Sequence, residues 1–487
     1  MKKLTFPKNF MLGAAAAAHQ YEGAYDSDNK GLSTADYKFY DPNLDRKKIS
    51  LDAIEFYTDS YAEIKTNPNK IYPYRFGIDF YNRYKSDLKL FKETGVNCFR
   101  TSITWSRIFP DDGVLNKKGI DYYRDVFLEM KNNGIELIVT VSHFDFPIWF
   151  LEKYNGFLGG DKAIDKFLEF AKIVLTEFNQ YVKYWLVFNE MNIGTYSSYT
   201  GGGFILDRDD PKRKEKLWQA VHNQFVAQAK FIKLAKSIDR NIKVGFMSAS
   251  RLSYPNTCKP EDVLLNHQQL QKNLFFYFDL SVKGYYPKYM LNFFLKENLK
   301  IEMKPDDLKL LKEYTVDFLS FSYYSSFVIS VEILEQTGGN LRSGAKNQYL
   351  ESNEWGWQID PIGLRVIMNE VYYRYNKPLL ISENGIGWNE KWDNEKNQLN
   401  DTYRISYLKE HLKNVLLAID DGVECLGYTT WTPFDLISAS TKEISKRYGL
   451  IYVGQDDYGK GTKARKIKES GKWFKTIADS NGEKLWE

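Results

Sequence analysis

Two glutamates stand at the ends of two apolar runs, and together they could carry out acid–base and nucleophilic chemistry. Residues 184–188 are apolar or aromatic and lead to Asn189 and Glu190, and residues 378–381 lead to Glu383. Near-continuous apolar runs of this kind are typical of strands in a parallel sheet that is covered on both faces. In a β/α barrel, chemistry is placed at the C-terminal strand ends. We therefore expect the two glutamates to face each other across one pocket, although either one alone could equally cap a helix.

A pair of carboxylates without a metal-binding motif indicates glycoside hydrolysis. One carboxylic acid would protonate the leaving oxygen, while the other carboxylate would attack the anomeric carbon or activate a water molecule. The spacing along the sequence gives no distance between the two groups, so it leaves retention and inversion of configuration open. The five histidines are scattered and form no His-x-His strand end, which argues against a metal-dependent barrel hydrolase. We expect no metal and no organic cofactor.

The elements that must position these groups alternate along the chain as strand and helix. Amphipathic helices are predicted at 79–94, 116–133 and 405–421, each followed by a glycine and an apolar run. This repeated unit favours right-handed crossovers and a parallel sheet. Strands are predicted at 10–18, 96–105, 135–143, 184–190, 243–248, 317–324, 379–383 and 423–431. We therefore predict an α/β fold, a single (β/α)8 TIM barrel domain over residues 1–487, with long loops such as 20–76 over its C-terminal face.

Further polar and aromatic side chains end other predicted strands and would share the same pocket. Arg100 could keep the nucleophile ionised, because a nearby cation lowers the pKa of a carboxylate, or it could form a structural ion pair. Tyr324 could hydrogen-bond the nucleophile or belong to the core. His143 could bind a sugar hydroxyl or be structural. The side chains expected at this end of the barrel, besides the two glutamates, are Gln20, Arg100, His143, Asn189, Tyr324 and Trp431.

Composition argues against several classes of function. The net charge of +4 is small for a chain of 487 residues, which argues against a nucleic-acid-binding or membrane role. Aromatic residues make up 16% of the chain, a hint of a carbohydrate site. The three cysteines are widely spaced and form no disulfide framework or zinc motif, which favours a reducing compartment. Residues 10–18 fit a barrel strand better than a secretory leader, and no apolar run approaches the ~20 residues of a membrane helix.

Five segments, in order along almost the whole chain, resemble motifs of glycoside hydrolase family 1. They are residues 20–24, 99–107, 142–144, 188–190 and 381–385. This resemblance implies a β/α barrel and a retaining double displacement, with Glu190 as the acid/base and Glu383 as the nucleophile. It also implies that Tyr324 supports the nucleophile. The positions that match the family's glycone site are Gln20, His143, Asn189 and Trp431.

One departure from the family pattern is Ser322, where many members carry asparagine; serine here is similar to the phospho-sugar branch. Members that act on unmodified glucosides usually carry a Glu-Trp pair soon after the residue matching Trp431, and this chain does not. Ser440, Lys446 and Tyr448 resemble the trio that binds phosphate in 6-phospho-β-glycosidases. A carboxylate would repel a 6-phosphate, whereas a hydroxyl, an ammonium and a phenol would bind it. The alternative for this trio is a polar loop with an exposed lysine.

The sequence thus predicts a cytoplasmic, retaining 6-phospho-β-glucosidase that releases glucose 6-phosphate from phosphorylated cellobiose or aryl glucosides. Its expected partner is that small-molecule substrate, with no nucleic acid or membrane and a possible homo-oligomer. Ala439 resembles the gluco type, since galacto-specific members tend to carry a bulky tryptophan there. A 6-phospho-β-galactosidase, an unphosphorylated β-glucosidase and a non-catalytic sugar-binding protein remain alternatives. Either Trp355 or Trp357 could contact the aglycone, or both could serve only in packing.

Overall fold

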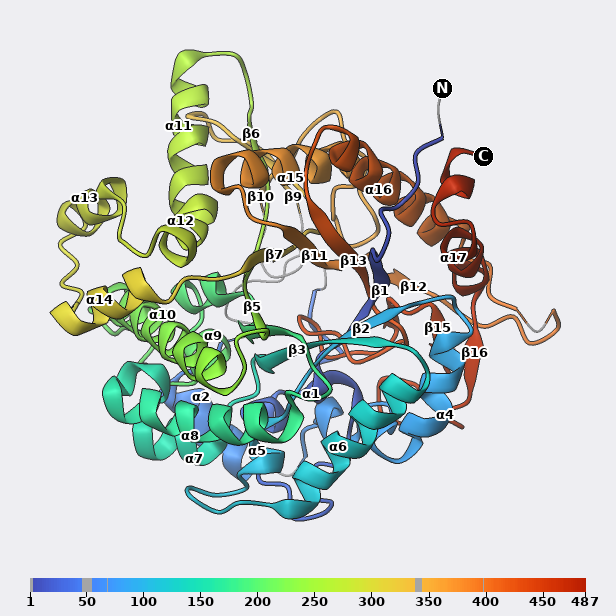
Figure 1. The fold of residues 1–487 in the computed structure, drawn as a ribbon, viewed down its shortest axis with the longest axis horizontal. Coiled ribbons are helices and arrows are strands. Elements are labelled where there is room, and N and C mark those ends of the chain that lie inside the picture. The colour runs from blue at the N-terminus through green and yellow to red at the C-terminus, as the bar shows by residue number, and fades with distance from the viewer. Residues whose placement is uncertain (1–2, 46–54, 68, 338–343, 397) are drawn as a thin grey trace.

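Eight parallel strands close into a barrel in the computed structural model, which describes residues 3–45, 55–67, 69–337, 344–396 and 398–487 (Figure 1). The strands are β1 (Met11–Ala15), β2 (Cys98–Ser102), β3 (Glu136–Ser142), β4 (Tyr184–Phe188), β5 (Lys243–Ala249), β7 (Phe318–Ser322), β11 (Leu379–Asn384) and β13 (Cys425–Trp431). Each lies where a strand was predicted. β13 pairs with β1 and closes the barrel. The prediction of a (β/α)8 barrel is confirmed.

Helices between the strands surround the barrel (Figure 1). They are α4 (Phe80–Lys92), α6 (Lys117–Asn132), α8 (Asp161–Phe178), α10 (Arg213–Ile238), α12 (Phe276–Lys283), α15 (Pro361–Tyr375), α16 (Thr402–Asp420) and, after the last strand, α17 (Glu469–Asp479). The three helices predicted from sequence are α4, α6 and α16. In α8 the buried residues include Ile164, Phe167, Phe170 and Val174, a three-to-four-residue spacing that turns one apolar stripe toward the barrel.

The remaining elements lie in the connections and after β13. The shorter helices are α1 (Ala18–Tyr21), α2 (Thr58–Thr66), α3 (Pro73–Phe76), α5 (Trp105–Ile108), α7 (Ile148–Tyr154), α9 (Ser198–Gly202), α11 (Pro260–Leu270), α13 (Lys288–Lys296) and α14 (Pro305–Glu313). The short strands are β6 (Ser253–Pro255), β8 (Phe327–Ile329), β9 (Gln336–Thr337), β10 (Gly344–Ala345), β12 (Trp388–Asn389), β14 (Lys446–Arg447), β15 (Ile451–Val453) and β16 (Arg465–Ile467). The predicted loop 20–76 therefore carries helices of its own, and residues 46–54 within it lie outside the described residues.

The barrel interior is filled by apolar side chains below the polar strand ends, which makes it a packed core and not a channel. One buried cluster takes a side chain from each of seven barrel strands: Met11, Cys98, Ile138, Leu186, Met247, Phe318 and Leu380. Neighbouring strands approach closely here. A Cβ on Gly13 would stand 1.9 Å from the carbonyl oxygen of Cys98, so β1 and β2 can pair in this register only with glycine.

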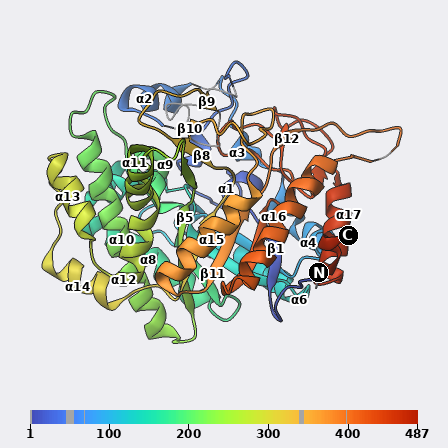
Figure 2. The ribbon, with the colours of Figure 1, turned by 90° about the horizontal axis from the view of Figure 1, so that it is seen from above.

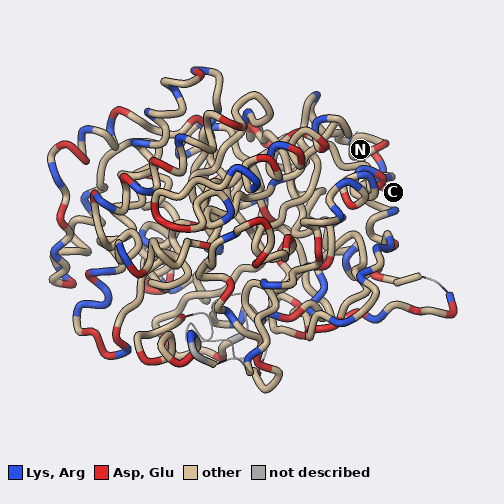
Figure 3. Tube along the Cα trace, turned by 90° about the horizontal axis from the view of Figure 1, so that it is seen from below, with Lys and Arg blue, Asp and Glu red and all other residues tan. Residues whose placement is uncertain are grey.

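The two ends of the described chain lie side by side beside α17 (Figures 1 and 2). The Trp486 indole donates a hydrogen bond to the carbonyl oxygen of Leu4 at 2.9 Å, and the Asn481 amide donates to that of Phe6 at 2.8 Å. Basic and acidic residues are interspersed along the trace (Figure 3). Within the described residues, we find no helix that is both long and apolar enough to cross a membrane.

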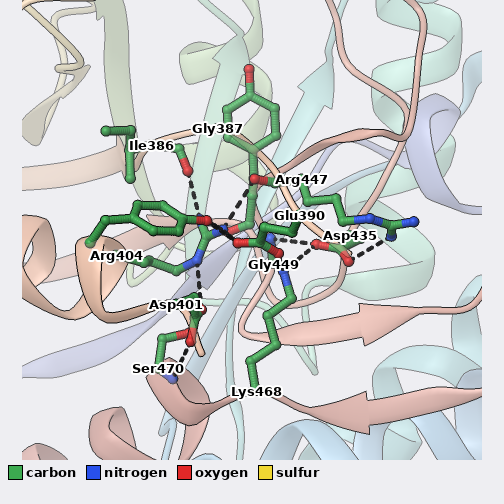
Figure 4. A network of polar contacts seen from close by, with 12 residues as sticks. Ile386, Gly387, Glu390, Asp401, Arg404, Asp435, Arg447, Gly449, Lys468 and Ser470 are labelled. Atoms are coloured by element: carbon green, nitrogen blue, oxygen red, sulfur yellow. Dashed lines mark hydrogen bonds and ion pairs between the residues drawn. The ribbon is translucent and has the colours of Figure 1, made fainter. Parts of the chain in front are cut away.

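A buried ionic network underlies the connections that follow β11 and β13 (Figure 4). The Lys468 ammonium lies 2.5 Å from Glu390 Oε2 and 2.7 Å from Asp435 Oδ1, and Arg447 Nη1 lies 2.9 Å from Asp435 Oδ2. Arg404, on α16, pairs with Glu390. All five side chains are buried. A buried ion pair adds little net stability compared with apolar side chains of similar size. Removal of one partner, however, leaves the other charge buried and unpaired, which is costly.

We expect Lys468→Met to lower the free energy of unfolding by about 3–5 kcal/mol, because it leaves Glu390 and Asp435 buried without their shared cation. Urea unfolding followed by circular dichroism would measure the loss. Lys472→Met on the exposed face of α17 is the matched control, and it should change stability by less than about 0.5 kcal/mol. Equal stability of the two variants would show that the network does not hold these connections.

Candidate active site

The side chain of Glu383 enters the barrel through an irregularity in β11. Between Ile381 and Glu383 this strand advances two residues while its partner β7 advances one, from Phe321 to Ser322. A bulge of this kind re-aims the side chains that follow it, and bulges are frequent next to active sites. Glu383 is buried, and the Tyr324 hydroxyl donates a hydrogen bond to its Oε2 at 2.8 Å.

Arg100, on β2, joins four strands around the barrel mouth. Its Nη1 lies 2.5 Å from Glu383 Oε1 beyond the β11 bulge, and its Nη2 donates to Asn189 Oδ1 at 2.6 Å at the end of β4. Its Nε donates to Thr140 Oγ1 on β3 at 3.0 Å. The side chain is only 1% exposed. Charge-assisted hydrogen bonds from a planar guanidinium fix both direction and charge, so Arg100 orients the Glu383 carboxylate and favours its ionised form.

Glu190 follows β4 with a left-handed backbone, φ +40°, which a non-glycine residue adopts only when the surrounding structure holds it there. Its backbone N–H donates to the Met247 sulfur on β5 at 2.9 Å, and the Ser322 hydroxyl on β7 donates to its carboxyl oxygen. Burial, and next the negative charge of Glu383, raise the pKa of Glu190 to about 8, while the Ser322 hydrogen bond and Arg100 oppose the rise.

The two glutamates therefore differ in environment in the way that an acid and a nucleophile require. Burial also raises the pKa of Glu383, but Arg100 and Tyr324 act against this and stabilise its anion. Because the two carboxyl groups interact, one negative charge in the site disfavours a second. The charge resides on Glu383, and Glu190 holds the proton at neutral pH.

The residues predicted to hold the sugar lie at or after the C-terminal ends of β1, β3, β4 and β13. His143 follows β3, and its ring centre lies 6.2 Å from that of Trp431 at the end of β13. Burial, and next the charge of Arg100, lower the pKa of His143 well below its ordinary value, so the imidazole is neutral. Asn189 is tied to Arg100. Gln20, on α1, is buried and donates from Nε2 to the carbonyl oxygen of Ile437 at 2.7 Å, which joins it to the connection after β13.

The predicted phosphate trio gathers in that same connection. Ser440, Lys446 and Tyr448 are all buried, at 0%, 0% and 3% exposure, so the alternative of an exposed loop lysine is wrong. Ser438 links two of them, since its hydroxyl lies 3.4 Å from Ser440 Oγ and hydrogen-bonds the Tyr448 side chain. The Lys446 ammonium lies 5.9 Å from the centre of the Tyr448 ring. β14, which holds Lys446, pairs with β12 in the connection after Glu383.

A cavity of about 250 Å³ opens beside Glu190. Its lining includes Ser322 and Tyr324, and also the polar Arg251 and Asn273. Trp355, which we expected to be a possible aglycone contact, does not line this cavity. It is 3% exposed, and its ring centre lies 5.3 Å from the Lys446 ammonium.

Some contacts in the site were not predicted from the sequence. Ser322 was noted only as a departure from the family pattern, and its bond to Glu190 depends on how close the ends of β7 and β4 lie. The sequence offers Trp357 beside Trp355 as a possible aglycone contact, but it does not predict that the Trp357 ring lies between Tyr324 and Lys446. The alternating Trp-Gly-Trp pattern was the one available signal, and it does not say which way either ring points.

Comparisons with known proteins agree with this geometry. The model of the family described as glycosyl hydrolase family 1 matches residues 2–483. The chain is 44% identical to the aryl-phospho-beta-D-glucosidase BglH of Bacillus subtilis, over 99% of this chain and 98% of that protein. It is 41% identical to the 6-phospho-beta-glucosidase AscB of Escherichia coli, over 99% of both. A family 1 β-glucosidase structure from Thermotoga maritima is similar with a TM-score of 0.81 at 27% identity, covering 99% of both chains. The chain belongs to glycosyl hydrolase family 1.

Proposed function

We propose that this chain is a retaining 6-phospho-β-glucosidase, which hydrolyses 6-phospho-β-D-glucosides to glucose 6-phosphate and the aglycone. The observation that carries the proposal is one mouth of the barrel that holds two buried glutamates, one bonded to Arg100 and the other to Ser322, and also a buried ammonium with two hydroxyl side chains. The names of full-length relatives, an aryl-phospho-beta-D-glucosidase, a 6-phospho-beta-glucosidase and a phospho-cellobiase, support the same substrate class.

In the first displacement, the Glu383 carboxylate attacks the anomeric carbon, and a covalent glycosyl-enzyme forms as the bond to the leaving oxygen breaks. Glu190 gives its proton to that oxygen, so the aglycone departs neutral. Arg100 and Tyr324 hold the attacking carboxylate in place and in its ionised form. The cavity beside Glu190 is the space into which the leaving group would extend.

In the second displacement, a water molecule attacks the anomeric carbon and releases Glu383. The negative charge that raised the pKa of Glu190 is consumed when Glu383 becomes an ester, so Glu190 keeps its charge more easily after it has lost its proton. It then takes the proton of the attacking water. Each displacement inverts the anomeric carbon, and two inversions retain its configuration.

The substrate is held at both ends of the sugar ring. Gln20, His143, Asn189 and Trp431 would contact the hydroxyls and the apolar face of the glucose unit. Ser440, Lys446 and Tyr448 would bind the 6-phosphate, with the ammonium supplying charge and the hydroxyls supplying hydrogen bonds. Ala439 beside Ser440 resembles the gluco type of these enzymes, which supports glucose over galactose configuration. A phosphorylated sugar does not cross membranes unaided, so we place the enzyme in the cytoplasm, as a single domain.

The substrate class is tested by kcat/KM on p-nitrophenyl β-glucoside, its 6-phosphate and the 6-phospho-galactoside, for wild type and Lys446→Ala. Wild type should prefer the 6-phospho-glucoside strongly. Lys446→Ala should raise KM for it by about 10- to 100-fold, since a hydrogen bond to a charged group is lost, and leave the unmodified glucoside nearly unchanged. Wild-type preference for the unmodified glucoside would refute the phosphate site, and preference for the galactoside would refute the assignment from Ala439.

Glu383→Gln should lower kcat by at least ~10³-fold while substrate still binds, because the amide keeps the shape of the side chain but cannot act as the nucleophile. Rapid-quench turnover measurements together with calorimetric titration of the 6-phospho-glucoside would separate chemistry from binding. Activity within tenfold of wild type would rule out the double displacement through Glu383.

Ser322→Ala should move the alkaline limb of the pH profile of kcat/KM to higher pH. The limb reflects loss of the Glu190 proton, expected near pH 8 in the wild type. The Ser322 hydroxyl donates to that carboxyl and lowers its pKa, so removing the donor raises the pKa. A limb that stays in place, or moves to lower pH, would contradict this role of Ser322.

A further inference from the structure

Three aromatic rings surround the ammonium of Lys446. Its Nζ lies 4.4 Å from the ring centre of Trp357, 5.3 Å from that of Trp355 and 5.9 Å from that of Tyr448. These distances fall within the ~6 Å over which the face of a ring attracts a cation. We call Trp355, Trp357 and Tyr448 the aromatic cage. The two tryptophans are 3% and 2% exposed, so the attraction acts in a poorly hydrated setting, where it is strongest.

The backbone that carries the two indoles is held by one side chain. Asn353 Oδ1 accepts hydrogen bonds from the backbone N–H groups of Trp355 at 3.0 Å and Trp357 at 2.9 Å. Gly356 between them has φ +76°, a conformation that glycine adopts without strain. This turn presents both rings to Lys446. These hydrogen bonds hold the two indoles in fixed positions.

Trp357 also reaches the catalytic half of the site. Its ring centre lies 5.7 Å from that of Tyr324, in an edge-to-face arrangement, and the Tyr324 hydroxyl donates to Glu383. It lies 6.2 Å from the Tyr448 ring on its other side. One indole thus touches both the tyrosine that orients the nucleophile and two members of the predicted phosphate trio.

We propose that Trp355 and Trp357 are positioning residues for phosphate recognition, whose π faces fix the place of the Lys446 ammonium that would bind the sugar 6-phosphate. A ring attracts the cation through its quadrupole and carries no net charge. This inference rests on the proposed function, and it assigns to Trp355 a role different from the aglycone contact expected from sequence.

The test compares Trp355→Leu and Trp357→Leu with the phenylalanine variants at both positions. Trp355→Leu should raise KM for p-nitrophenyl β-glucoside 6-phosphate about tenfold, with kcat and the KM for the unmodified glucoside within about twofold of wild type. Trp355→Phe, which keeps a ring, should recover most of the loss. Trp357→Leu should raise the same KM and also lower kcat, because Trp357 packs on Tyr324.

Trp392→Leu is the matched control. Its ring centre lies 4.4 Å from the Lys466 ammonium, the same distance as that between Trp357 and Lys446. Lys466 does not belong to the predicted phosphate trio. Its removal should change neither substrate's KM. Binding of glucose 6-phosphate and of glucose by each variant, measured by calorimetry, gives an independent readout, in which only the phosphorylated sugar should lose affinity.

Equal loss for both substrates in Trp355→Leu, or a phenylalanine variant no better than leucine, would show that the indoles act only in packing and would overturn the proposal. The phenylalanine variants keep this test decisive even where leucine disturbs folding. A wild-type enzyme that prefers the unmodified glucoside would instead overturn the proposed function itself. If the wild type prefers the phosphorylated substrate and the cage variants keep the same preference, only the role of the cage is refuted.

Discussion

The Arg100 guanidinium is the interaction on which the site depends. It is buried inside the barrel mouth and bonds Thr140, Asn189 and Glu383, which come from three other strands. A buried guanidinium must satisfy its donors, and here each donor bond is also a positional restraint. The Glu383 carboxylate supplies the balancing charge, so the ion pair that satisfies Arg100 also keeps Glu383 ionised. Loss of either partner would leave the other charge buried and uncompensated.

Once one negative charge is fixed on Glu383, the protonation of Glu190 follows. Glu190 is buried, feels the Glu383 charge, and receives only partial relief from Ser322 and Arg100. The difference between two chemically identical side chains therefore arises from which strand end each one occupies. The left-handed backbone at Glu190 shows that the chain accepts local strain to place the acid there. In the mechanism that we propose, the same charge disappears when the glycosyl-enzyme forms, which would allow Glu190 to act first as acid and then as base.

Much of this architecture could be predicted from sequence because it depends on local patterns of residue types along the chain. The eight apolar runs, the helix–glycine–strand repeats and the motifs around Glu190 and Glu383 identified the barrel strands and the residues at their ends. What could not be predicted depends on contacts between distant segments. The β11 bulge that redirects Glu383 changes no residue type, and the Trp357 ring contacts residues from the connections after both β7 and β13. No periodicity in the chain encodes either feature.

Arg404 connects the segment that follows Glu383 with the segment that carries the predicted phosphate trio. Arg404 donates from Nη1 to the carbonyl oxygens of Ile386 at 2.6 Å and Tyr448 at 2.9 Å, and so it joins the segment after Glu383 to the strand that carries Lys446 (Figure 4). The approach of these segments is close: a Cβ on Gly387 would stand 2.9 Å from the Tyr448 ring and 3.0 Å from Lys446 Cγ. Buried ions that satisfy one another, among them Arg404, Glu390 and Lys468, hold this geometry. The Lys446 ammonium, which we propose binds the 6-phosphate, is therefore carried by a segment whose position is tied to the segment after Glu383.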